Sequence, residues 1–138
     1  MIHVFCNKRG SGKTKALIGR ANEIALECKG DVVYIDDDSR HIFDLDRKIR
    51  FISTEDYNLK DNNCFYGFLC GILSEDYDID TIFIDGLFNI INGDMKDAAH
   101  LFFDMEKIAK KMNVDLYINI NHEESEVPDF MKEYVAIA

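Results

Sequence analysis

Short apolar runs alternate with longer amphipathic stretches along the whole chain, and this alternation predicts strands and helices in turn. The apolar runs are bounded by polar residues or glycine, as buried strands usually are. They predict strands over residues 2–6, 32–36, 49–53, 81–85, 114–119 and 134–137. Between the strands, apolar residues three to four positions apart predict helices over residues 15–28, 62–73 and 94–112.

Strands that alternate with helices typically form a parallel sheet with helices on its faces. The sequence therefore predicts a three-layer α/β sandwich with a mostly parallel sheet. No linker, repeat or low-complexity segment interrupts the sequence, so residues 1–138 are expected to form one domain. A shorter helix, capped by Ser39, is expected to bury Ile42, Phe43 and Leu45, and another turn is expected near Pro128.

The segment between the first strand and the first helix has the composition of a phosphate-binding loop, or Walker A motif. Gly-Lys-Thr stands at the head of the helix, and the pattern Gly-x-x-x-x-Gly-Lys-[Ser/Thr] departs only at its first glycine, where Asn7 stands. Asparagine tolerates a positive φ better than other non-glycine residues, so the turn is still possible. The expected nucleotide-binding residues are Asn7, Lys8, Arg9, Gly10, Ser11, Gly12, Lys13 and Thr14.

The parts of this loop have different expected roles. Backbone N–H groups surround the phosphate oxygens, and the helix dipole adds its positive end. Lys13 is expected to reach the terminal phosphates, and the Thr14 hydroxyl to bind Mg2+. Lys8 and Arg9 leave two alternatives open: one of them clamps a phosphate, in this or a neighbouring subunit, or both only solvate the loop.

Acidic residues follow two of the predicted strands. The carboxyl ends of parallel strands lie at the same sheet edge as the phosphate loop, so Asp85 is expected to support Mg2+ beside Thr14 rather than only face solvent. One carboxylate of Asp36, Asp37 and Asp38 could orient or deprotonate the attacking water. Strand alternation favours Asp36 and Asp38 over Asp37. Helix capping or solvent exposure is the alternative for all three.

The amides at the end of the fifth predicted strand are further candidates. Asn119 and Asn121 could hold the attacking water or sense the terminal phosphate, and turn formation is the equally open alternative. The catalytic candidates are therefore Lys13, Asp36, Asp38 and Asn121, and the metal candidates are Thr14 and Asp85.

Charge and cysteine content indicate which partners and which cellular compartment to expect. The chain has 26 acidic and 16 basic residues and a net charge of −10, which argues against nucleic acid as a constitutive partner but does not exclude a local basic groove. The four cysteines include no Cys-x-x-Cys pair, as expected of a reduced, cytoplasmic protein. The sequence shows neither a signal peptide nor an apolar run of about 20 residues, so no membrane span is expected.

These stretches together resemble the RecA-like branch of P-loop ATPases. Residues 32–36 resemble its second strand, residues 78–87 its Walker B strand, and residues 106–118 the helix and sensor strand of RecA and DnaB-type cores. The chain is also similar to small clostridial-type P-loop NTPases, often labelled ATP-binding or twitching-motility PilT-like. The shared stretches are Gly-Ser-Gly-Lys-Thr-Lys (10–15), Val-Tyr-Ile-Asp-Asp-Asp (33–38), Phe-Tyr-Gly-Phe (65–68) and Ile-Phe-Ile-Asp-Gly (82–86).

The sequence departs from these families at two positions. Asn7 replaces the first loop glycine, and Gly86 stands where many ATPases of this branch carry a glutamate base. RecA and DnaB cores place the base on another strand. The loop is also partly similar to the deviant loop of MinD and ParA ATPases, because Lys8 stands at their signature position, but Arg9 departs from that pattern.

The resemblance implies binding of ATP with Mg2+, and it leaves the function open. The first hypothesis is a slow Mg2+-dependent ATPase that acts as a switch. The second is a non-hydrolysing interaction module whose nucleotide is structural or regulatory, as the missing glutamate suggests. A small-molecule kinase is a third option, although no arginine-rich lid segment is present. RecA-like cores commonly complete the site with a basic residue of a neighbour, so self-association or another protein partner is expected.

Overall fold

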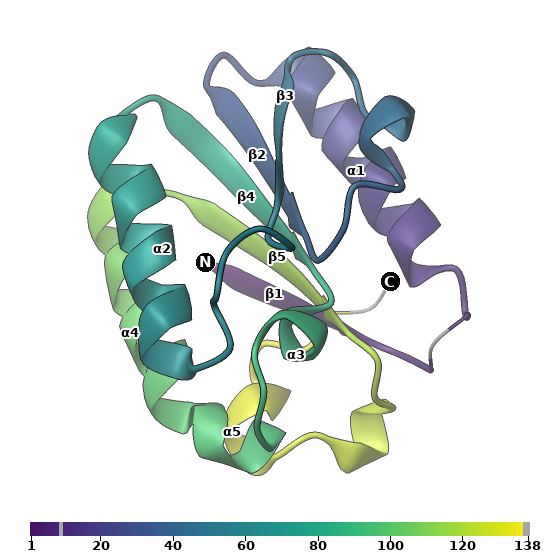
Figure 1. The fold of residues 1–138 in the computed structure, drawn as a ribbon, viewed down its shortest axis with the longest axis vertical. Coiled ribbons are helices and arrows are strands. Elements are labelled where there is room, and N and C mark those ends of the chain that lie inside the picture. Colours follow the sequence, from purple (N-terminus) through teal and green to yellow (C-terminus); the bar gives the residue numbers. More distant parts are fainter. Residues whose placement is uncertain (9, 137–138) are drawn as a thin grey trace.

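Five parallel strands form the middle layer of the computed structural model, which describes residues 1–8 and 10–136. The order across the sheet is β1-β5-β4-β2-β3, and all four pairings are parallel (Figure 1). The predicted α/β fold with a parallel sheet is therefore confirmed. The strands are β1 (Ile2–Cys6), β2 (Asp31–Asp36), β3 (Ile49–Ser53), β4 (Ile79–Asp85) and β5 (Asp115–Ile120).

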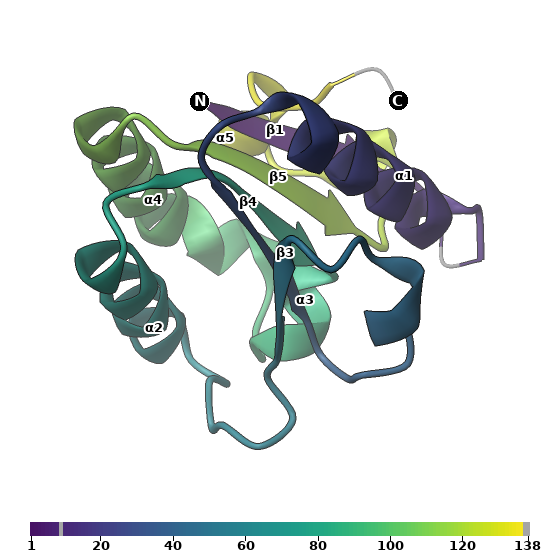
Figure 2. The same ribbon diagram turned by 90° about the horizontal axis from the view of Figure 1, so that it is seen from above.

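Helices cover both faces of the sheet. Helix α1 (Lys13–Glu27) lies on one face, and α2 (Asn62–Glu75) and α4 (Ala99–Met112) lie side by side on the other (Figure 2). No helix within the described residues has both the length and the apolar character needed to span a membrane. The shorter elements are η1 (Ile42–Asp44), α3 (Leu87–Ile90), η2 (Met95–Ala98), η3 (Glu124–Glu126) and α5 (Asp129–Lys132).

The strands are apolar on both sides because both sides are buried, as is typical of parallel sheets. On β2, Val33 and Ile35 pack into the core beneath α2 and α4, while Val32 and Tyr34 pack into the core beneath α1. The adjacent strand β4 alternates in the same way, with Phe83 on the α1 side. This arrangement leaves the carboxyl ends of the strands as the place where polar residues of several strands can meet.

The chain does not form the sixth strand that the sequence predicts over residues 134–137. Within the described residues, Val135 makes a single parallel bridge to Val4 at the outer edge of β1. The Val4 N–H donates to the Tyr134 carbonyl, and the Ala136 N–H donates to the Val4 carbonyl, each at 2.8 Å. Residue 137 lies outside the described part of the chain, and the prediction is wrong for the rest of the segment.

The segment after Ser39 also differs from its prediction. The three-residue turn η1 replaces a longer helix, and Phe43 is 95% exposed rather than buried. Only Leu45 packs inward. The reason is a polar attachment to α1: the Asn22 side chain donates to the Asp44 carbonyl at 3.0 Å and accepts from the Asp46 N–H at 2.8 Å. These bonds hold the turn beside α1 without burying its apolar side chains.

The close approach of the α1–β2 turn to the start of β4 yields a stability prediction. A Cβ added to Gly30 would lie 2.6 Å from the backbone carbonyl oxygen of Asp78. Gly30→Ala should therefore lower the free energy of unfolding by about 1–3 kcal/mol. Gly71→Ala is the matched control, because a Cβ there meets nothing within 4 Å, and it should raise the free energy by about 0.5–1 kcal/mol. Urea denaturation measures both, and an unchanged Gly30→Ala protein would contradict the packing described.

Candidate nucleotide-binding site

The loop between β1 and α1 depends on two glycines. Gly10 has φ 83° and Gly12 has φ 89°, a left-handed conformation that glycine adopts without steric cost. Within the loop, the Ser11 N–H donates to the Lys8 carbonyl at 3.2 Å. Gly12 is the N-cap residue of α1, and its carbonyl accepts the first helical hydrogen bond from Ala16 at 3.0 Å. The local sequence thus sets the turn that leads into the helix.

The start of α1 is suited to an anion. Its N-cap residue is Gly12, no side chain of the described residues caps this helix end, and the first turn contains no acidic residue. The first N–H groups of a helix have no partner within it, and the helix dipole places positive potential there. An oxyanion such as a phosphate satisfies both conditions.

Asn7, at the position of the motif's first glycine, supports the loop in another way than expected. Among the described non-glycine residues, Asn113 alone has a positive φ, so Asn7 does not use the left-handed conformation. Its side-chain oxygen instead accepts from the Lys8 N–H at 2.9 Å. The Lys13 ammonium group reaches back over the loop and donates to the Lys8 carbonyl at 2.9 Å. Lys13 therefore already lies over the concave side of the loop.

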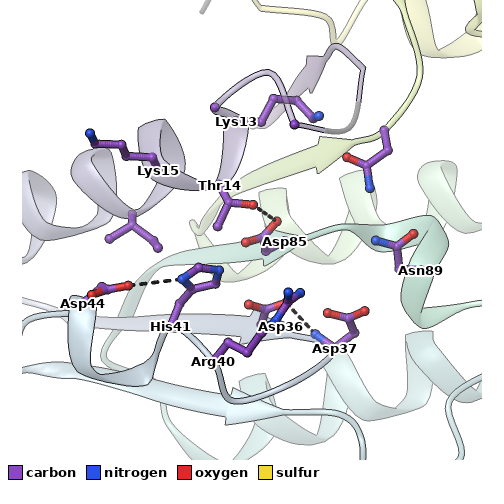
Figure 3. Close-up of a pocket in the computed structure, with 14 residues that line it drawn as sticks. Lys13, Thr14, Lys15, Asp36, Asp37, Arg40, His41, Asp44, Asp85 and Asn89 are labelled. Atoms are coloured by element: carbon purple, nitrogen blue, oxygen red, sulfur yellow. Dashed lines mark hydrogen bonds and ion pairs between the residues drawn. The ribbon is translucent and has the colours of Figure 1, made fainter.

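The two residues expected to support a metal lie next to each other (Figure 3). The Thr14 hydroxyl donates to Asp85 Oδ1 at 3.3 Å, and the Tyr34 hydroxyl donates to Asp85 Oδ2 at 2.9 Å. Asp85 is buried at the carboxyl end of β4. A hydroxyl and a carboxylate at the head of a phosphate loop are oxygen ligands of the kind that Mg2+ prefers, so these residues fit that ion.

Asp36 is a buried carboxyl group at the end of β2, close to the same place. Its Oδ1 accepts from the Asp37 N–H at 2.7 Å. Burial, a side-chain hydrogen bond with Asp37 and the charge of Asp85 together raise the pKa of Asp36 to about 8. A carboxyl group that gains and loses its proton near neutral pH is suited to general acid–base chemistry.

Asp37 and Asp38 do not lie where strand alternation predicts. Strand β2 ends at Asp36, so alternation does not extend to the bend that follows. Asp37 lines the cavity beside the loop, and Asp38 does not. Asp38 instead accepts from the Arg40 backbone N–H and from Arg40 Nε, each at 2.9 Å.

The two asparagine candidates, Asn119 and Asn121, also have different surroundings. Asn121 lines the cavity. Asn119 is buried, and its Oδ1 accepts a hydrogen bond from the Gly86 N–H, so its role is to join β5 to the turn after β4. Asn89, which the sequence did not single out, also lines the cavity because α3 forms inside the predicted loop. Gly86 is the N-cap residue of α3 and has φ 73°. A glycine directly after the strand is the one feature of the sequence that indicates this turn into a helix.

The cavity has a volume of about 710 Å3 and extends from the phosphate loop to the η1 turn. Gly10, Gly12, Lys13, Thr14, Asp36, Asp85 and Asn121 all line it. Its far wall contains Arg40, His41 and Asp44, to which the sequence gave no role; His41 Nδ1 lies 3.1 Å from Asp44 Oδ2.

Three expected nucleotide-binding residues do not line the cavity: Asn7, Lys8 and Ser11. Lys8 lies 3.3 Å from Glu123 in an ion pair between exposed side chains. Arg9 lies outside the described residues.

No protein-family model matches the sequence, and no curated protein matches it. Among solved structures, 62 chains match. One is the crystal structure of domain III from the Thermotoga maritima replication initiation protein DnaA, with a TM-score of 0.49 and 17% sequence identity over 96% of this chain and 50% of that chain. The chain thus spans about half the length of that structure, and a likeness at this level does not identify a ligand.

The raised pKa of Asp36 predicts how stability depends on pH. In the unfolded chain this carboxyl group loses its proton near pH 4, whereas in the folded protein it keeps the proton until about pH 8. Between these values folding takes up a proton, so the contribution of Asp36 to stability falls as pH rises, by at most about 1.4 kcal/mol per pH unit. Asp36→Asn should lack this loss. Urea denaturation at pH 5 and pH 8, without nucleotide or Mg2+, should therefore show the variant gaining about 2–4 kcal/mol relative to wild type. A difference that is independent of pH would contradict the raised pKa.

Proposed function

We propose that the chain is an ATP-binding protein and a slow Mg2+-dependent ATPase that acts as a switch. One observation carries the proposal: a loop with two left-handed glycines leads into an uncapped helix, and the second residue of that helix is hydrogen-bonded to a buried aspartate of β4. Phosphate, lysine and metal ligands would thereby converge within one cavity. The resemblance to RecA-like cores and to small clostridial-type P-loop NTPases supports ATP as the nucleotide.

The described side chains have complementary roles in this proposal. Lys13 exchanges the Lys8 carbonyl for the β- and γ-phosphates. Thr14 and Asp85 would hold Mg2+, which would supply charge neutralisation when bound. Asp36 accepts a proton from the attacking water, and the Asn121 amide helps to orient that water. Phosphoryl transfer depends mainly on positioning and charge stabilisation, so these groups suffice for slow turnover.

Slow turnover follows from the choice of base. In the metal-free protein, with a pKa of about 8, Asp36 is mostly protonated at neutral pH, so only a small fraction of molecules has a carboxylate ready to accept a proton. Asp38 does not line the cavity and pairs with Arg40, whereas Asp37 lines it, so we place Asp37 ahead of Asp38 as a second carboxylate near the water. Slow hydrolysis would keep a bound nucleotide in its triphosphate form for a long time, as a switch requires.

A non-hydrolysing interaction module is the second candidate. Gly86 follows Asp85, so no glutamate is available directly after the metal-supporting residue, and its N–H is occupied by Asn119. In this case nucleotide would stabilise the fold for a protein partner or a second copy of the chain. The net charge of −10 makes nucleic acid an unsuitable partner for most of the surface.

Thermal-shift measurements test nucleotide binding. A ligand at 100 times its Kd stabilises the folded state by about 2.7 kcal/mol, so ATP with Mg2+ should raise Tm by several degrees. Lys13→Ala should abolish this shift. Lys107→Ala, which removes an exposed lysine of α4, is the matched control and should retain it. An undiminished ATP shift in Lys13→Ala would refute the proposed phosphate site.

Phosphate release distinguishes the two candidate functions. We expect the wild type to release phosphate from ATP slowly, and Asp85→Ala to release none, because Mg2+ loses its support. Asp36→Asn should retain the ATP thermal shift but lower kcat by about 10²–10⁴-fold, the usual contribution of a general base. Wild-type protein that binds ATP yet releases no phosphate over several hours would favour the interaction module instead.

A further inference from the structure

Tyr34 places a hydroxyl group within a mostly apolar layer. Its side chain is fully buried on β2, on the face covered by α1. The ring stacks between neighbouring strands, with its centroid 6.3 Å from that of Phe51 on β3 and 5.9 Å from that of Phe83 on β4. Phenylalanine occupies both neighbouring positions, so packing alone does not require a hydroxyl group at residue 34. A buried hydroxyl without a partner would destabilise the core.

The hydroxyl group has one specific partner, which is Asp85. Tyr34 donates to Oδ2 at 2.9 Å, while Thr14 donates to Oδ1 at 3.3 Å. The two oxygens of one carboxylate are therefore held by different elements, β2 and α1. Burial, reinforced by the neighbouring Asp85 charge, raises the pKa of Tyr34 well above its usual value. A phenolic hydroxyl keeps its proton at physiological pH, so the tyrosine is the donor and Asp85 the acceptor in this pair.

The backbone next to Asp85 is fixed as well. The Gly86 N–H donates to the buried side chain of Asn119 on β5. With its backbone held in this way, the Asp85 side chain can still rotate about its own bonds, and the Tyr34 hydroxyl, together with that of Thr14, restrains this rotation. Hydrogen bonds to a charged group are stronger than those between neutral groups, so this restraint is substantial.

We propose that Tyr34 is a positioning residue of the metal site: its hydroxyl holds Asp85 Oδ2 so that Oδ1 stays on Thr14, where these two residues would hold Mg2+. This role rests on the proposed function, because it assigns Mg2+ to Thr14 and Asp85. Tyr34 touches neither the nucleotide nor the metal in this account, and it acts only through Asp85. Removing its hydroxyl should therefore weaken Mg2+ binding selectively, leaving metal-free nucleotide binding unchanged.

A magnesium titration of the ATP-dependent thermal shift tests this selectivity. Tyr34→Phe keeps the stacked ring, and it should raise the Mg2+ concentration for the half-maximal shift roughly tenfold, as expected for loss of a hydrogen bond to a charged group. The ATP shift in EDTA should stay within about twofold of wild type in its midpoint concentration. Tyr117→Phe is the matched control, because this tyrosine stacks on Phe83 at 5.0 Å and its hydroxyl has no hydrogen bond among the described residues. The control should titrate like wild type.

The possible outcomes separate this inference from the function on which it rests. An unchanged Mg2+ midpoint in Tyr34→Phe would overturn the positioning role and leave the nucleotide site intact. An equal loss with Mg2+ and with EDTA would overturn it too, since that result indicates a structural role only. No ATP shift in the wild type would refute the nucleotide-binding proposal and, with it, this role.

A second measurement needs neither metal nor nucleotide. In a double-mutant cycle, Tyr34→Phe and Asp85→Ala are compared singly and together by urea denaturation. Contacting residues give non-additive losses, so the double variant should be less destabilised than the sum of the single variants. Additive losses would show that the hydroxyl and the carboxylate do not interact, and would overturn the proposal.

Discussion

The candidate site depends on the hydrogen bonds to the buried carboxylate of Asp85. A buried charge needs hydrogen-bond partners, and Asp85 finds them on α1 through Thr14 and on β2 through Tyr34. Strand β5 separates β1 from β4 in the sheet, so adjacent strand pairing does not by itself bring the phosphate loop to Asp85. The hydrogen bond from Thr14 makes this connection across β5. This hydrogen bond fixes the first turn of α1 relative to the end of β4. The backbone amides of that turn and Lys13 are thereby fixed as well.

The same sheet edge places two buried carboxyl groups close together, and this proximity links the chemistry to the fold. The charge of Asp85 adds to burial in raising the pKa of Asp36. Neighbouring carboxyl groups with different environments commonly take different roles in one site. Here Asp85 is tied to two hydroxyl donors and suits the support of a metal, while Asp36 suits the exchange of a proton. Under the proposed function, a base that is mostly protonated at neutral pH would make hydrolysis slow.

Much of the fold was predictable because both faces of the sheet are buried, which makes the strands continuous apolar runs; β1 and β3 have the predicted bounds. The glycine-containing turn before α1 and the pairing of Thr14 with Asp85 were predictable because the motif is local and parallel strands share an edge. The rest depends on contacts distant in sequence. Phe43 is exposed because Asn22 holds the η1 turn to α1. Asn89 reaches the cavity through a short helix that periodicity cannot detect, and the role of Tyr34 depends on a partner 51 residues away.

The central claim is that the loop between β1 and α1 binds a triphosphate with Mg2+. Its most direct test is a crystal structure with Mg2+ and a non-hydrolysable ATP analogue. We expect Lys13 Nζ to leave the Lys8 carbonyl and contact the terminal phosphates, with the Thr14 hydroxyl in the metal coordination sphere and Asp85 beside it. A nucleotide bound elsewhere, or an empty loop with Lys13 still on the Lys8 carbonyl at saturating ligand, would contradict the account.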